Sequence, residues 1–490
     1  MPPLVTGFFV SAILRSVDMA DRLSLTFFPE ETMTDAVAGD SQTADPNSPS
    51  ATDRLPLFTA FGWGMGTLGV AAMYNAVNIL LLQYLVDYVG IGAAIAGLLM
   101  ALSKLYDAFT DPVIGAISDR SKSKMGRRRP FLLYGCGLLA LSAILLFNVP
   151  SGLSSNLTIL YAGGALILYA TAYGLFGVPY MAMPAEMTTS ANERSRLISF
   201  RVLAVSIASL IATFVGPVVL KYFDNSATGY SIYSSMLAAL AIIGGVTAFL
   251  ATKKAPFHYQ DNPYDLNIFK MVRLAWLNKP FMLLVAVKLI SLMTMAVTQA
   301  VMPFLFFQVL SLDAAQLGYY FLLFYLGMMC SQPLWLMIAR KLGKRWLFIT
   351  TTLLSSLVAL TWALASSGDP YIYVLARGLA AGIIGGGGLM VGQSLLPDVM
   401  AYDYKLTGMR REGLLSAVYT LVEKFAFAMG TTLTGIVLGL TGYIKGTGGA
   451  PVQQPESVVN SLYTLIAVFP ISVACICAVL IYFIRIPGQK

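Results

Sequence analysis

Three ionisable residues lie close together in an otherwise apolar stretch of the sequence: Lys104, Asp107 and Asp111. Residues three or four positions apart on a helix lie on the same face, so a helix would present all three side chains together. Ionisable groups within a membrane-spanning helix are costly and usually face the bundle interior, where they find partners. Two carboxylates and one ammonium on one face therefore predict a cation site. The alternative is a structural ion pair with Lys104, which would leave one carboxylate without a counter-charge.

The composition is that of a membrane protein. Of the 490 residues, 57% are hydrophobic and only 11% are charged, whereas soluble domains have roughly 25% charged residues. The net charge of +8 does not indicate a nucleic-acid partner, because the cations lie in short connections between apolar stretches. One histidine and four cysteines in apolar segments provide neither a metal cluster nor a disulfide framework. We expect no metal or other cofactor. The sequence has no pattern typical of a nucleophile–base triad or of a nucleotide-binding fold, so we do not expect an enzyme.

From Leu57 onward, apolar stretches alternate with short polar connections. A spanning helix needs ~20 apolar residues, and most of these stretches are about that long. The pattern predicts an all-α polytopic membrane protein with twelve transmembrane helices, at residues 57–87, 92–118, 131–149, 157–183, 197–221, 231–251, 280–308, 314–338, 346–366, 371–396, 414–440 and 458–484.

The chain divides into four parts. Residues 1–56 are largely polar, acidic and rich in Ser, Thr and Pro, which predicts a mostly disordered cytoplasmic segment; translation from Met19 or Met33 is an alternative. Residues 57–251 and 280–490 predict two six-helix bundles, joined by a cytoplasmic linker at 252–279. This 6+6 organisation is typical of transporters built from repeats, which bind their substrate between the halves.

The basic residues predict the orientation. Lys and Arg gather in the N-terminal segment, in the connection after every even-numbered span and in the C-terminal tail, whereas the other side has only Lys221 and Lys445. Connections rich in Lys and Arg remain in the cytoplasm. Both termini are therefore predicted to be cytoplasmic, in a multi-pass protein of the plasma (inner) membrane.

Three motifs in order, DAFTDPVIGAISDRSKSKMGRRRPF, YGLFGVPYMAMPAEMTTSANERSRLISFR and TGMRREG followed by Lys424, carry a resemblance. There the sequence resembles the major facilitator superfamily, and within it the glycoside–pentoside–hexuronide:cation symporters, which include the melibiose permeases. The resemblance implies import of a sugar or glycoside coupled to H⁺ or Na⁺. It implies that Asp107, Asp111 and Lys424 couple the cation, and that Thr110 can supply an oxygen where melibiose permeases have Asn.

The sequence departs from the melibiose permeases at two glycines. Gly177 stands where they have a sugar-binding acid, and Gly174 where they have a Thr that helps to bind Na⁺. These changes argue against a galactoside held by paired carboxylates and favour H⁺ over Na⁺. The residues expected to line the substrate cavity are Lys104, Tyr74, Asn75, Asn78, Tyr173 and Tyr180.

Charged residues near the ends of the spans are expected to form a cytoplasmic latch, whose ion pairs hold one access state closed. They are Asp119, Arg120, Arg127, Arg128, Arg129, Glu186, Arg194, Arg196, Arg201, Arg410 and Glu412. Binding of anionic lipid by the Arg127–Arg129 run is the alternative. Lys288 lies near the end of its span, which predicts that it extends to the membrane interface. The glycine-rich run 382–392 lacks the ending of a phosphate-binding loop and predicts close helix packing.

Three functions remain open. The first is cation-coupled symport of a sugar or glycoside by a functional monomer in contact with membrane lipids. The second keeps the fold but carries a lysolipid or another amphipathic molecule, because the sugar-binding acids are missing. The third is a membrane receptor without transport, which would have no need for the predicted coupling residues Asp107, Asp111 and Lys424.

Overall fold

The computed structural model describes residues 55–188, 190–255, 278–407, 412–445 and 452–483, and every regular element within these ranges is helical. The first half contains α2 (Leu57–Met65), α3 (Thr67–Ala76), η2 (Val77–Leu81), η3 (Tyr84–Tyr88), α4 (Ala93–Asp119), α5 (Arg129–Phe147), α6 (Ser155–Met187), α7 (Ala191–Leu210), η4 (Ile211–Val215), α8 (Gly216–Tyr222) and α9 (Ala227–Ala251). The second half contains α11 (Lys279–Phe304), η5 (Leu305–Val309), α12 (Ala314–Cys330), α13 (Gln332–Leu342), α14 (Lys344–Trp362), α15 (Tyr371–Thr407), α16 (Glu412–Leu440), α17 (Glu456–Tyr463), η6 (Thr464–Val468) and α18 (Phe469–Tyr482).

The number of spans agrees with the prediction once one broken helix is taken into account. Eleven helical stretches of the described chain are long and apolar enough to cross a membrane, and a bent pair brings the number to twelve. This pair is α12 and α13, which meet at an angle of 42°. The span predicted over 314–338 is therefore present but bent: α12 ends at Cys330, and α13 begins at Gln332 with Pro333 in its first turn. Proline has no backbone N–H to continue the first helix.

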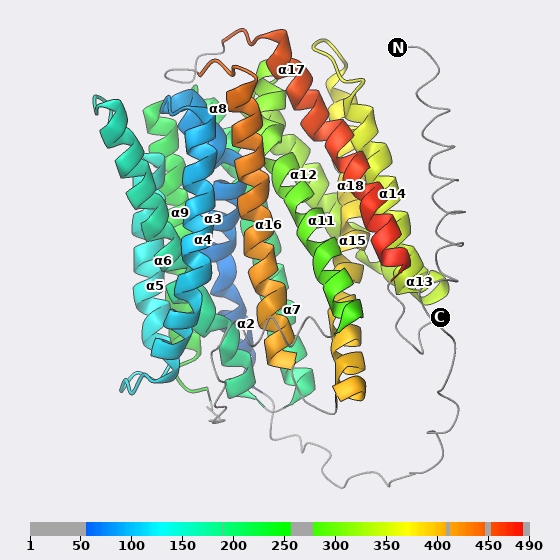
Figure 1. The fold of residues 1–490 in the computed structure, drawn as a ribbon. Helices are drawn as coiled ribbons and strands as arrows, with labels where there is room; N and C mark the ends of the chain where they lie inside the picture. Colours follow the sequence, from blue (N-terminus) through cyan, green and yellow to red (C-terminus); the bar gives the residue numbers. More distant parts are fainter. Residues whose placement is uncertain (1–54, 189, 256–277, 408–411, 446–451, 484–490) are drawn as a thin grey trace, which may run out of the picture.

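The helices of each half pack mainly on one another. In the first half, α5 packs on α6 and α9, while α2 and α3 pack on α7 and α9. In the second half, α15 packs on α12 and α14, and α11 packs on α16 and α18. The main contacts between the halves join α4 to α16, which lie side by side in Figure 1, and α8 to α12. The predicted bounds of the two bundles stay a prediction, and residues 1–54 and 256–277 lie outside the described residues.

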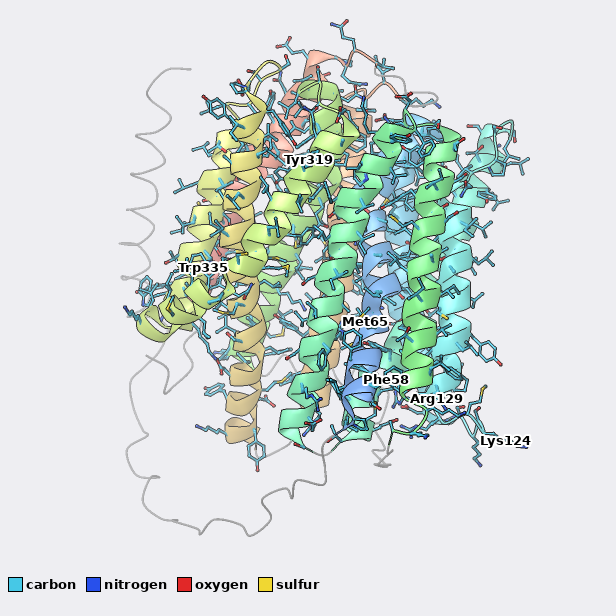
Figure 2. All side chains as sticks on the ribbon, turned by 180° about the vertical axis from the view of Figure 1, so that it is seen from behind. Phe58, Met65, Lys124, Arg129, Tyr319 and Trp335 are labelled. Carbon is cyan, nitrogen blue, oxygen red and sulfur yellow. The ribbon has the colours of Figure 1, made fainter. Side chains whose placement is uncertain are left out.

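The two ends of the bundle differ in their side chains. Figure 2 shows Lys124 and Arg129 at one end, which we call the basic end, whereas Tyr319 lies toward the other, which we call the far end. The chain enters α2 at the basic end, where Phe58 lies (Figure 2).

Glycines bring α15 close to α12. A Cβ on Gly382 would lie 2.0 Å from the Phe324 carbonyl oxygen, and one on Gly386 would lie 2.8 Å from that of Met328. Any larger residue at Gly382 would push the two backbones apart. The close packing predicted for the glycine-rich run is confirmed at these positions.

Candidate functional site

The acidic pair predicted from the sequence meets a lysine from the other half of the chain. Asp107 and Asp111 lie one turn apart on α4, and Lys424 reaches them from α16. The Lys424 Nζ lies 2.8 Å from Asp107 Oδ2 and forms a second ion pair with Asp111 Oδ2. We call these three residues the ionic centre. One ammonium thus lies between two carboxylates. The first half of the chain contributes the carboxylates, and the second half contributes the ammonium.

Each carboxylate keeps one oxygen without a protein donor. Asp107 Oδ1 and Asp111 Oδ1 are buried and have no hydrogen-bond partner in the part of the chain that the structure describes. Both lie beside Gly174 of α6, where a Cβ would be 3.5 Å from the first oxygen and 2.6 Å from the second. A buried, unpaired carboxylate oxygen is costly, and a proton or a metal cation would satisfy it. The geometry therefore fits a cation site.

Thr110 and Lys104 do not join this centre directly. The Thr110 hydroxyl donates to the Tyr106 carbonyl at 3.1 Å within its own helix, so its part as a cation ligand stays a prediction. Among the described residues, no carboxylate lies within ion-pair distance of Lys104. Lys104 therefore forms no ion pair with either aspartate in this structure, in contrast to the alternative considered from the sequence.

Lys104 instead lies among three tyrosines. Its Nζ is 5.2 Å from the ring centroid of Tyr74, 5.6 Å from that of Tyr169 and 5.8 Å from that of Tyr173. We call these rings the tyrosine cage. Tyr169 was missed in the sequence, although its spacing of four from Tyr173 places both on one face of α6.

A second ion pair lies beside the ionic centre, with the side chain of Lys288 largely buried and that of Glu423 44% exposed. Lys288 of α11 donates to the Tyr419 carbonyl at 2.8 Å and to Glu423 Oε2 at 3.1 Å. The prediction that Lys288 extends to the membrane interface was therefore wrong. Glu423, adjacent to Lys424 in α16, points toward α11 rather than α4, because consecutive helical residues differ in direction by about 100°.

Three of the predicted cavity residues are used in packing. The Tyr180 hydroxyl donates to the Trp63 carbonyl at 2.8 Å, and its ring stacks on Trp63 at 4.6 Å. Asn75 donates to Ser209 Oγ at 3.0 Å and accepts from the Tyr325 hydroxyl at 2.8 Å, which ties α3 to α7 and to α12. Asn78 is buried and donates to the carbonyl of Tyr74. In this structure these side chains make contacts with protein groups, and their part in lining a substrate cavity stays a prediction.

At the basic end, an arginine cluster joins three helices of the first half. Arg128 pairs with Asp119 of α4 at 2.7 Å and with Glu186 of α6 at 2.7 Å. Arg127 also forms an ion pair with Glu186. Arg129 instead donates to the Phe249 carbonyl at 2.7 Å. The expected ion pairs between neighbouring helix ends exist here, within one half of the molecule.

Of the remaining latch candidates, the structure describes the side chains of Arg120, Arg194, Arg196 and Arg201. Glu193 pairs with Arg196 at 3.2 Å and accepts from the Leu55 backbone N–H at 3.1 Å, a contact that no sequence pattern indicated. Arg120 and Arg194 are exposed, and Arg201 is half-buried. Arg410 lies outside the described residues, as does the side chain of Glu412.

The far end ties the two halves together. The Tyr443 hydroxyl, just after α16, donates to Asp87 Oδ1 at 2.8 Å. Lys221, in the last turn of α8, pairs with Asp313, just before α12, at 3.7 Å. At the basic end, by contrast, the pairs described above join helices of one half, as does Lys344 with Asp398. The sequence indicated none of the far-end contacts, because they join residues far apart in the chain.

A family model described as MFS/sugar transport protein matches residues 62–488. The chain belongs to this family. Similar proteins include the glucuronide carrier protein homolog of Escherichia coli (strain K12), 28% identical over 445 residues, covering 89% of this chain and 94% of that protein. The putative glycoside/cation symporter YagG of the same organism is 25% identical, over 85% of this chain and 89% of its own. The isoprimeverose transporter of Lactiplantibacillus pentosus is 24% identical, over 82% and 84%.

Membership in the sugar-transport family confirms the resemblance predicted from the motifs, together with the all-α major facilitator fold. The family and these relatives are transporters rather than enzymes. The chain is thus a multi-pass membrane transporter.

In this transporter, we expect Gly174→Ala to disturb the ionic centre. The new Cβ would lie 2.6 Å from Asp111 Oδ1 and force that carboxylate to move. The coupling-ion concentration giving half-maximal uptake should rise by roughly tenfold, which corresponds to ~1.4 kcal/mol. The matched control is Gly164→Ala on the same helix, which has nothing within 4 Å of its Cβ. Equal ion dependence in both variants would contradict the assignment.

The arginine cluster supports a second comparison in the transporter. The side chain of Glu186 is only 13% exposed, whereas that of Asp119 is 54% exposed. Removing one partner of a buried ion pair costs about 3–5 kcal/mol, whereas an exposed pair contributes ~0–1 kcal/mol. Glu186→Gln should therefore lower the thermal unfolding midpoint in detergent far more than Asp119→Asn. An equal effect of both would show that the cluster's burial does not matter.

Proposed function

We propose that this protein is a secondary active transporter that carries a sugar or glycoside together with a cation by alternating access. The observation that carries the proposal is the ionic centre, where carboxylates of α4 meet an ammonium of α16 between the two halves. Transporters built from repeats bind their substrate and coupling ion at the interface between the two halves. The names of the relatives, a glycoside/cation symporter and an isoprimeverose transporter, support a sugar over a lysolipid. The charged centre supports transport over a receptor role.

We propose H⁺ rather than Na⁺ as the coupling ion. A sodium ion needs several oxygen ligands, but Gly174 offers no side-chain oxygen beside the carboxylates, and Thr110 donates within its own helix. A proton needs only a carboxylate with a suitable pKa. The unpaired Oδ1 atoms of Asp107 and Asp111 supply that chemistry.

The pattern of contacts supports a conformation that is closed at the far end. Asp87–Tyr443 and Lys221–Asp313 join the halves there, whereas the arginine cluster joins helices of one half. In the proposed orientation, the basic end and both termini are cytoplasmic in the plasma membrane. When the transporter changes to the outward-open conformation, the far-end contacts break and the basic end closes. The protein functions as a monomer.

The decisive experiment is uptake by proteoliposomes of purified protein, with a panel of labelled glycosides and lysolipids under an imposed pH or Na⁺ gradient. We expect accumulation of a glycoside above its equilibrium level only with the pH gradient. Accumulation driven by Na⁺ alone would overturn the choice of ion, and failure of every glycoside under both gradients would overturn the function. Melibiose should be transported poorly, because Gly177 supplies no carboxylate.

The orientation is tested by cysteine labelling in a background without the native cysteines. A cysteine at Ser123, in the basic loop, should react with a membrane-impermeant reagent only from the cytoplasmic side. One at Ser151, exposed at the far end, should react only from outside. The expected contrast is nearly complete, because such a reagent does not cross the bilayer. Labelling of both from one face would exclude the twelve-span orientation.

A further inference from the structure

Lys104 is a buried cation without an ion-pair partner among the described residues. Its residue surface is only 8% exposed, and it lies on α4 one turn from the ionic centre. The nearby carboxylates are engaged by other lysines, Asp107 and Asp111 by Lys424, and Glu423 by Lys288. No hydrogen bond or ion pair of Lys104 occurs among the described residues. Burying an ammonium in this way is costly unless an anion compensates for it.

The tyrosine cage lowers this cost only in part. Three ring faces within 6 Å attract the ammonium through their quadrupoles, but none of them carries a formal charge. Tyr74 and Tyr173 are half-buried. Aromatic rings that remain partly open can also pack against the apolar face of a ligand.

A second group points to a ligand at the same place. Tyr169 is 2% exposed, and its hydroxyl has no hydrogen-bond partner in the described part of the chain, although its ring lies against Lys104. Buried hydroxyls normally have a partner. Gly177, four residues after Tyr173 and on the same face of α6, has nothing within 4 Å of its Cβ position. An unpaired donor, a cation without an ion-pair partner and open space thus lie along one stretch of the site.

We propose that Lys104 and the tyrosine cage bind an anionic group on the substrate, so that the cargo is an acidic glycoside with a carboxylate or sulfonate. This inference rests on the proposed sugar transport and names its substrate class. Lys104 forms a charge-assisted hydrogen bond with the acidic group, Tyr169 donates a second one, and Tyr74 and Tyr173 contact the sugar ring.

The charges around the site explain how such a substrate is coupled to the ion. Two carboxylates and two ammonium groups balance when Asp107 and Asp111 are ionised beside Lys424 and Lys104, and Glu423 with Lys288 forms a separate neutral pair. Loading of the coupling ion leaves one positive charge in excess. An anionic substrate restores the balance, so each of the two partners tightens binding of the other by the same factor.

The test compares substrates that differ only in the acidic group. Methyl β-D-glucuronide and methyl sulfoquinovoside are compared with methyl β-D-glucoside, by equilibrium binding to the purified protein and by gradient-driven uptake. We expect the wild type to bind at least one acidic glycoside roughly 10- to 100-fold more tightly than the neutral one, the range of one charge-assisted contact. The two acids distinguish a carboxylate from a sulfonate. Preference for the glucoside would overturn the inference.

Variants assign the preference to the site. Lys104→Met should remove the discrimination between acidic and neutral glycosides, whereas Lys104→Arg should retain most of it. Because removal of a buried lysine can impair folding, Tyr169→Phe provides an independent variant that keeps the ring and loses only the unpaired hydroxyl. It should weaken binding of the acidic glycoside several-fold. Unchanged discrimination in folded Lys104→Met, or unchanged acidic binding in Tyr169→Phe, would overturn the assignment.

The outcomes separate this inference from the proposed function. Accumulation of the neutral glucoside in preference to the acids supports sugar transport and overturns the acidic substrate. Lys104-dependent binding of an acid without gradient-driven accumulation supports the anion site and overturns coupled transport. Failure to bind any of the three glycosides overturns the inference.

Discussion

Asp107→Asn and Asp111→Asn should each abolish gradient-driven accumulation of substrate. Each change removes a carboxylate whose free oxygen is proposed to bind the coupling ion, and it weakens an ion pair with Lys424. A hydrogen bond to a charged group contributes about 1.5–3 kcal/mol, which corresponds to a loss of roughly 10- to 150-fold in ion affinity. Accumulation should therefore fall to the level of empty liposomes.

Exchange of substrate without a gradient separates coupling from binding. We expect both Asn variants to retain exchange of labelled for unlabelled substrate, because the proposed substrate contacts lie on Lys104 and the tyrosine cage. The control is Asp224→Asn, an exposed carboxylate after α8 that belongs to neither the ionic centre nor the latch. Accumulation by both Asn variants under either gradient would exclude the ionic centre as the coupling site.

Lys424→Ala should have the largest effect on the folded protein. It leaves two carboxylates one turn apart without their shared ammonium, in a site where Asp107 is buried. Removing one partner of a buried ion pair costs about 3–5 kcal/mol. The yield of monodisperse protein in detergent and its unfolding temperature should both fall, and accumulation should be lost.

A double variant distinguishes charge from packing at this position. Lys424→Ala combined with Asp111→Asn removes one cation and one anion together, so the folded protein should recover much of its stability while coupling stays lost. Removing only one partner of a buried pair leaves its charge uncompensated, whereas the double variant leaves the net charge of the site unchanged. Equal instability of the double and single variants would instead mean that the Lys424 side chain acts by packing.

Membrane insertion and the first half of the ionic centre were determined by the sequence. Spans follow from the length of the apolar stretches, since each must cover the hydrocarbon core on its own. The common face of Asp107 and Asp111 follows from a spacing of four on one helix. The family also followed from the sequence, because its motifs are contiguous. Even the bend after Ser331 has a local signal in Pro333.

The partners of the buried charges were decided only by the tertiary structure. Lys424 follows Asp111 by 313 residues, and Lys288 precedes Glu423 by 135. From the sequence, Lys424 could pair with Asp107 or with Asp111, and Lys288 was predicted at the membrane interface. Periodicity shows which residues share a face of a helix, but it does not show which helix packs against that face. The packing of α4 against α16 made both aspartates partners of Lys424. Lys104 was thereby left among the three tyrosines, since Lys424 makes the ion-pair contacts of both carboxylates.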